Sequence, residues 1–158
     1  MSQRNSYDHE VHPLIAERWS PRSFSERTID ESQLASVLEA ARWAPSCFNE
    51  QPWRFIVALR QDPAEFQRLL SCLVDENQAW AKRAAALMVT VTSSSFSLNG
   101  NPNPHAWHDV GLAIGQLTLQ AGSMGLHVHQ MAGFKSQQAR ELYGIPEGFE
   151  AVTAVAIG

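Results

Sequence analysis

Residues 107–124 constrain the fold more than any other stretch, because they are apolar nearly all round an expected helix. A helix without a polar face is buried, either inside a protein or in an interface. Gly111 and Gly115 lie four residues apart and would let another backbone approach closely, and Gly125 is placed to end the helix. The stretch also carries polar side chains that exclude a membrane helix: His108, Asp109, Gln116 and Gln120. We therefore predict a long, buried helix in a soluble protein.

The rest of the chain mixes helical and strand patterns. The sequence predicts helices at residues 9–17, 62–73, 77–85 and 136–143, of which the second is opened by Asp62 and Pro63 and the last by a Ser136 cap. Another predicted helix begins at an Asp30 cap, with Gln33 placed to complete a capping box, and ends before Pro45. Aromatic and β-branched runs predict strands at residues 53–59, 87–92, 126–131 and 151–157, the second of them covered on both faces. Because helices and strands do not alternate strictly, we predict the α+β class.

Length and composition limit the organisation and the partners. The 158 residues suit one domain, residues 1–158, with no repeat or linker. A formal net charge of −4 argues against nucleic acid and anionic membranes as general partners. No apolar run is long enough to span a membrane, and the polar residues 1–5 lack the apolar core of a signal peptide. With only Cys47 and Cys72, a disulfide framework is not expected, and we predict a cytoplasmic location.

Residues 18–22 place two guanidinium groups and a hydroxyl at alternate positions around a proline. The residue before a proline favours extended geometry, in which side chains two residues apart point to the same side. Arg18, Ser20 and Arg22 could therefore converge on one anion, such as a phosphate. A solvated basic turn beside a helix is an equally good interpretation of these residues.

Residues 44–53 form a loop between a predicted helix and a predicted strand. Ser46, Asn49 and Gln51 supply donors and acceptors between two prolines that stiffen the loop, Pro45 and Pro52. Such a loop can bind the polar edge of a flat heterocycle. The alternative is an ordinary turn, in which the amide side chains bond their own backbone.

No side chain is an obvious catalyst or metal ligand. His105 and His108 are three residues apart, and His127 and His129 could share one face of a strand, but neither pair has the further ligands of a known metal motif, so no metal site is predicted. Cys47 has no paired base in the sequence and is interpreted as a packing residue. This absence of acid–base machinery fits a protein whose bound cofactor performs the chemistry.

Three blocks of the sequence together resemble the FMN-dependent nitroreductases. Residues 18–24 resemble the family's flavin-phosphate motif, Arg-x-Ser-x-Arg/Lys followed by Phe. Residues 44–55 resemble its most characteristic segment, Ala-Pro-Ser-x-x-Asn-x-Gln-Pro-Trp-x-Phe. The run from Asp109-x-Gly111-x-Ala113 to Gly125-Leu126 is similar to its long central helix. The blocks spread over nearly the whole chain and occur in the order of the family.

The resemblance implies a central, mostly antiparallel sheet flanked by helices, in an intertwined homodimer with two FMN molecules at the interface. Arg18, Ser20 and Arg22 would then hold the phosphate and ribityl side of the flavin. Ala132 and Gly133 lie where a family backbone N–H points at flavin N5, and Asn77 is expected to approach the ring. Another set of residues would contact the flavin of the partner subunit or support the loop that does so: Pro45, Ser46, Cys47, Asn49 and Gln51.

The implied reaction is hydride transfer from NAD(P)H through flavin N5 to a nitroaromatic, a quinone or a similar small acceptor, with no side chain acting as a nucleophile. Residues 93–107 are the segment expected to shape the acceptor pocket. The alternatives are an FMN-binding module without efficient turnover, and other flavin chemistry such as dehalogenation or flavin fragmentation.

The sequence departs from the family pattern at two places. Family members usually continue past the final strand with a tail that wraps the partner and brings a basic residue to the phosphate, whereas this sequence stops at Gly158. We therefore expect Arg18 and Arg22 to carry more of the phosphate binding than is usual. Residues 131–134 also lack the acidic residue that some members place before the glycine.

Overall fold

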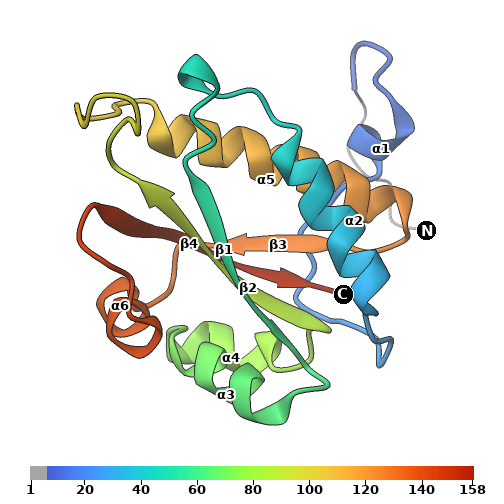
Figure 1. The fold of residues 1–158 in the computed structure, drawn as a ribbon. Coiled ribbons are helices and arrows are strands. Elements are labelled where there is room, and N and C mark those ends of the chain that lie inside the picture. Colours follow the sequence, from blue (N-terminus) through green and yellow to red (C-terminus); the bar gives the residue numbers. More distant parts are fainter. Residues whose placement is uncertain (1–6) are drawn as a thin grey trace.

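A computed structural model describes residues 7–158, so the N-terminal residues in which no signal peptide is predicted lie outside the described part. One antiparallel sheet has the strand order β1-β2-β4-β3 (Figure 1). The strands are β1 (Trp53–Leu59), β2 (Ala86–Ser93), β3 (Val128–Met131) and β4 (Phe149–Ile157). The predicted α+β class with a mostly antiparallel sheet is confirmed, and all four strands lie within two residues of their predicted bounds.

Helices cover both faces of the sheet (Figure 1). On one face lie α2 (Glu31–Arg42) and α5 (Ala106–Ser123), which pack on each other and on the sheet. On the other face lie α3 (Pro63–Ser71), α4 (Asp75–Ala81) and α6 (Ser136–Tyr143). Strand β2 contributes buried residues to both cores, because Met88 faces the first core while Leu87 and Val89 face the second. The prediction of a strand covered on both faces is confirmed.

The long helix α5 is buried along one side and open along the other. Val110, Ile114 and Leu117 are fully buried in the core beneath α2. On the opposite side, a Cβ atom added at Gly111 or Gly115 would meet no atom within 4 Å. Within residues 7–158, no other backbone therefore approaches the two glycines, and the predicted close approach does not occur inside one chain.

Two of the three helix caps predicted from the sequence are observed in the structure. Asp30 accepts a hydrogen bond from the backbone of Gln33, whose side chain returns one to Asp30, so the predicted capping box begins α2. Asp62 caps α3 in the predicted place. The prediction that Ser136 caps α6 is wrong, because the helix already includes Ser136 and its cap residue is Lys135.

Two predicted helices differ from the structure. The helix expected at residues 9–17 is only the single turn α1 (Pro13–Ala16), and Ile15 on its apolar stripe is 54% exposed. Without packing, so short a helix has little to extend it. The helix expected at residues 77–85 starts earlier, at Asp75, and ends at Ala81, because the backbone N–H of Ala85 instead donates to Ile157 at the sheet. None of the helices in the described residues is long and apolar enough to cross a membrane.

Candidate functional site

The 18–22 segment has the alternation that the sequence predicts. Pro21 is buried and its carbonyl oxygen lies 2.8 Å from Nδ1 of His129, and the ring of Trp19 lies edge-on to His127 at 5.8 Å. The three alternate side chains, Arg18, Ser20 and Arg22, are exposed. Arg18 Nη1 donates to Ser20 Oγ at 3.4 Å. The odd-numbered residues thus attach the segment to β3 and to the residue before it, and the even-numbered residues present donors to solvent.

The same histidines explain why the 18–22 segment is held on β3. His127 contacts the ring of Trp19, and His129 contacts the carbonyl of Pro21. The ring of His129 also lies 4.6 Å from that of Trp80 on α4, which stacks with Phe24 at 6.3 Å. These contacts connect the two ends of residues 18–24 to a strand and a helix that come more than fifty residues later.

The 45–51 loop has an unusual backbone. Phe48, Asn49 and Gln51 have φ values of 52°, 57° and 50°, in the left-handed region that side chains other than glycine rarely adopt. Asparagine tolerates this region, but phenylalanine does so at a cost, and residues held there cluster at functional sites. Phe48 is also 90% exposed, so burial does not offset its strain within this chain.

Hydrogen bonds within the 45–51 loop hold this backbone in place. The N–H of Gln51 donates to Ser46 Oγ at 2.9 Å, and Gln51 Nε2 donates to the carbonyl of Asn49 at 3.3 Å. Ser46 therefore still has its own hydroxyl proton to donate outward. The Gln51 side chain braces the loop, which is one of the two roles expected for it.

Asp109 connects the 45–51 loop to α5, and sequence reasoning gave it no role of its own. Its carboxylate is 2% exposed, and Oδ2 accepts the backbone N–H of Cys47 at 3.1 Å. It lies in the first turn of α5, where the helix dipole favours a negative charge. The one feature of the sequence that could have indicated a role for Asp109 is its position as a carboxylate within an apolar helical stretch. Its partner could not be predicted, because Cys47 lies 62 residues away in the sequence.

A shallow pocket of about 240 Å³ lies beside the 45–51 loop. It is lined by Pro45, Ser46 and Cys47 from the loop and by residues at the start of α5, namely His105, His108, Asp109 and Leu112. The predicted loop residues Pro45, Ser46 and Cys47 thus meet a surface with imidazole, carboxylate and apolar groups. Among residues 7–158, no group of three or more His, Cys, Asp or Glu side chains is arranged to hold a metal ion.

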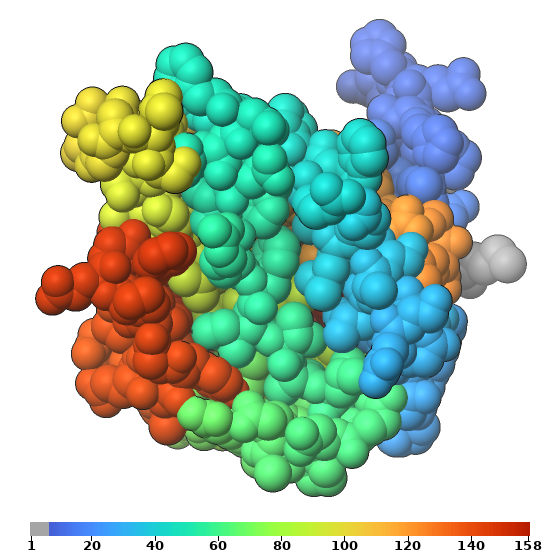
Figure 2. Space-filling view, in the orientation of Figure 1, coloured from blue at the N-terminus to red at the C-terminus, as the bar shows by residue number. Residues whose placement is uncertain are grey.

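The 94–104 loop stands beside the 45–51 loop, as the adjacent yellow and teal surfaces in Figure 2 show. Glu50 accepts hydrogen bonds from the backbone and the hydroxyl of Ser97, at 2.8 and 3.2 Å. The ring of Phe96 lies edge-on to Phe48 at 5.8 Å. Part of the segment expected to shape an acceptor pocket therefore contacts the loop expected to contact the flavin.

Ala132 and Gly133 lie just beyond β3, far from the 45–51 loop in sequence. The Gly133 carbonyl accepts a hydrogen bond from Asn77 Nδ2 at 2.9 Å. Asn77, which was expected to approach a flavin ring, is thus engaged with the turn itself. Beneath the turn, burial raises the pKa of the Cys72 thiol, so Cys72 stays protonated at neutral pH.

Two of the three groups of predicted site residues, the 45–51 loop and the 18–22 segment, lie at opposite ends of α5. The 45–51 loop is tied to Asp109 near the start of the helix, whereas Arg27 donates to the carbonyls of Met124 and Gly125 just past its end. The 18–22 segment lies at that second end, against His127. A helix of 18 residues is about 27 Å long at a rise of about 1.5 Å per residue. One chain therefore presents the two groups well apart.

Comparison with known proteins gives one consistent result. The model of the nitroreductase family matches residues 15–158. A protein of Archaeoglobus fulgidus with the provisional name NADH dehydrogenase/NAD(P)H nitroreductase is 29% identical over 149 residues, which cover 92% of this chain and 82% of that protein. An NADH dehydrogenase of Thermus thermophilus is 26% identical over 172 residues and is matched over 82% of its length, with 89% of this chain covered.

A solved structure agrees with these relatives. The crystal structure of an oxidoreductase containing FMN matches this chain with a TM-score of 0.93 and 34% sequence identity. The match covers 100% of this chain and 81% of the other.

Proposed function

The chain belongs to the nitroreductase family, and from this premise we propose that it is a single-domain, FMN-dependent oxidoreductase. The proposed reaction passes hydride from NAD(P)H to a small acceptor such as a nitroaromatic or a quinone. The names of its relatives support an oxidoreductase of this kind. The observation that supports FMN as the cofactor is the 18–22 segment, in which three exposed donor side chains alternate with two residues that contact His127 and His129.

The residues present fit FMN at both of its ends. Two guanidinium groups and a hydroxyl match a phosphate, because each can donate charge-assisted or neutral hydrogen bonds to its oxygens. The 45–51 loop offers the hydroxyl of Ser46, the amide of Asn49 and the apolar edge of Pro45 to a flat ring. FMN, when bound, supplies the hydride acceptor and donor at N5. The side chains bind and orient the reactants, and none has to act as a nucleophile.

We further propose that the functional unit is a homodimer in which each flavin takes its two walls from different subunits. One chain holds the phosphate-binding segment and the 45–51 loop at opposite ends of α5, which is about 27 Å long by the usual helical rise. The open side of α5 supports the same proposal, since Gly111 and Gly115 leave room for another backbone. Next to them lies a groove of about 270 Å³ that includes Leu119.

Replacing Gly115 with arginine tests the dimer. A Cβ atom added at this exposed position would meet nothing within 4 Å in the single chain, and glycine is a poor helix former, so the subunit should fold at least as stably as before. In a dimer packed along this face, the arginine would collide with the partner. We expect light scattering to give twice the subunit mass for the unaltered protein and the subunit mass for the variant. Gln137→Arg on α6, across the sheet, is the matched control and should remain dimeric.

The oxidoreductase activity is tested by flavin reduction. Purified protein is expected to quench the fluorescence of added FMN and to melt at a higher temperature in its presence, because ligands that bind the folded state stabilise it. Without oxygen, NADH or NADPH should bleach the flavin absorbance, and a nitroaromatic or a quinone should restore it. A protein that binds FMN and is never bleached would be a binding module. One that does not bind FMN would contradict the proposal altogether.

A further inference from the structure

The turn that follows β3 has one backbone N–H directed outward. The N–H of Phe134 donates to the carbonyl of Ala132 at 3.0 Å, a bond two residues apart that makes a γ-turn centred on Gly133. The peptide between Ala132 and Gly133 is trans, so its N–H points away from its carbonyl. That carbonyl faces into the turn, and the Gly133 N–H consequently faces out. Within residues 7–158, the Gly133 N–H has no acceptor.

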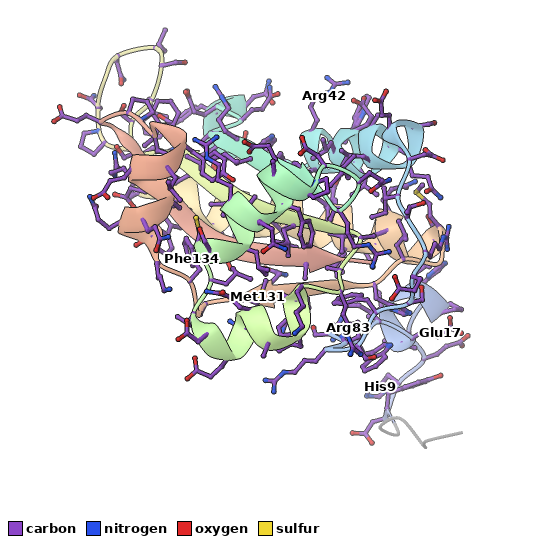
Figure 3. The ribbon with its side chains drawn as sticks, turned by 90° about the horizontal axis from the view of Figure 1, so that it is seen from below. His9, Glu17, Arg42, Arg83, Met131 and Phe134 are labelled. Atoms are coloured by element: carbon purple, nitrogen blue, oxygen red, sulfur yellow. The ribbon has the colours of Figure 1, made fainter. Side chains whose placement is uncertain are left out.

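Contacts from α3 and α4 fix this turn on its other side. The Gly133 carbonyl accepts two hydrogen bonds, from Asn77 Nδ2 at 2.9 Å and from the backbone N–H of Val74 at 3.2 Å. The next residue but one, Lys135, donates its N–H to the carbonyl of Cys72 at 2.6 Å. Figure 3 labels Met131 and Phe134, which flank the turn at the end of β3. The turn is therefore attached to the sheet at one end and to the α3–α4 junction at the other.

There is no spare room between Asn77 and the turn. A Cβ atom added at Gly133 would lie 2.7 Å from Asn77 Nδ2 and 2.9 Å from Val74 Cγ2, distances that packed atoms do not adopt. Asn77 is thus both the hydrogen-bond donor to the turn and the wall against which it rests. Moving or shortening this side chain would change the position of Gly133 directly.

We propose that Asn77 is a positioning residue, which holds the 132–134 turn so that the Gly133 N–H is presented to flavin N5. This inference rests on the proposed function, because it takes the acceptor of the N–H to be the flavin. Asn77 needs no contact with the flavin in this role, since its amide acts on the carbonyl of Gly133. Its effect therefore falls on the reacting end of the cofactor and not on the phosphate end, where Arg18 and Arg22 lie.

The neighbouring amide on α4 provides a matched control. Gln78 Nε2 donates to the carbonyl of Leu73 at 2.8 Å, so it makes the same kind of bond from the same helix to a different carbonyl. Asn77→Ala and Gln78→Ala each remove one amide-to-carbonyl hydrogen bond beside the turn. Asn77→Asp keeps the shape of the side chain and loses the donor when it is ionised. Only the two Asn77 variants should alter the environment of Gly133.

The experiment observes Gly133 by NMR in protein labelled with ¹⁵N-glycine, which contains nine labelled residues in all. In the unaltered protein and in Gln78→Ala, FMN is expected to shift the Gly133 amide resonance strongly. In Asn77→Ala and Asn77→Asp, that resonance should already differ before FMN is added, and its shift on binding should be largely lost. FMN affinity should change less than about tenfold, whereas hydride transfer from NAD(P)H should slow about ten- to a hundredfold.

The outcomes separate this inference from the function on which it rests. If the unaltered protein does not bind FMN, the proposed function fails. If FMN binds and the Gly133 resonance shifts equally in Asn77→Ala and in the unaltered protein, the positioning role fails alone. An equal loss in Gln78→Ala would mean that the effect comes from weakening α4, and it would also overturn the role of Asn77.

Discussion

Replacing both Arg18 and Arg22 with alanine is expected to weaken FMN binding by roughly two to four orders of magnitude and to leave the melting temperature of the apoprotein unchanged. A hydrogen bond to a charged group contributes about 1.5–3 kcal/mol, or about ten- to a hundredfold in affinity for each guanidinium group. Both side chains are exposed, so the fold does not depend on them. Fluorescence titration of FMN and thermal unfolding measure the two effects.

Arg42 provides the control for general loss of positive charge. It is exposed at the end of α2, where it is paired with Glu39, and it is labelled in Figure 3. Arg42→Ala should leave FMN affinity within about twofold. The double variant at residues 18 and 22 should also bind riboflavin, which lacks the phosphate, as well as the unaltered protein does. If the double variant keeps its full affinity for FMN, the phosphate role of the 18–22 segment is wrong.

Replacing Asp109 with alanine is expected to lower the free energy of unfolding by about 1–3 kcal/mol and to weaken FMN binding as well. The buried carboxylate accepts the Cys47 N–H and lies in the first turn of α5, and a bond to a charged group together with the dipole accounts for a loss of this size. The 45–51 loop would then lose its attachment to the helix. Denaturation in urea and limited proteolysis of the loop measure the stability and the loosening.

Asp109→Asn separates the carboxylate charge from the hydrogen bond. The amide keeps the shape and one acceptor oxygen, so the loop should stay attached, while the interaction with the helix dipole is reduced. We expect less than half of the stability loss and little change in proteolysis. The same cleavage rate in Asp109→Ala as in the unaltered protein would show that the loop does not need this contact.

Sequence reasoning worked best where the cause of a structure is local. The capping box of Asp30 and Gln33 and the strand from Trp53 to Leu59 depend on residues within a few positions of one another, and both were placed correctly. The alternation of residues 18–22 is also local, because it follows from the geometry imposed before a proline. Motif resemblance then indicated the segments that we propose to form a flavin site.

The remaining features depend on contacts between distant residues. Neither the bond of Asp109 to Cys47 nor that of His129 to Pro21 has a pattern at short range, since the partners are 62 and 108 residues apart. The helix predicted at residues 9–17 is longer than the observed α1 for a related reason. Its periodicity is real, but nothing in the described part of the chain buries Ile15, and helical periodicity without packing does not maintain a helix.

Strand β3 joins the two ends of the proposed flavin site within one chain. His129, on this strand, holds the carbonyl of Pro21, and Gly133 follows four residues later. At about 3.3 Å per residue, the two steps from His129 to Met131, the last residue of the strand, account for roughly 7 Å of the separation between the proposed phosphate-binding segment and the turn proposed to face flavin N5. Inserting or deleting a single residue in β3 would change that separation and also turn His129 to the other face of the sheet. The length of this strand therefore sets part of the distance from phosphate to ring that the proposed flavin site can accommodate.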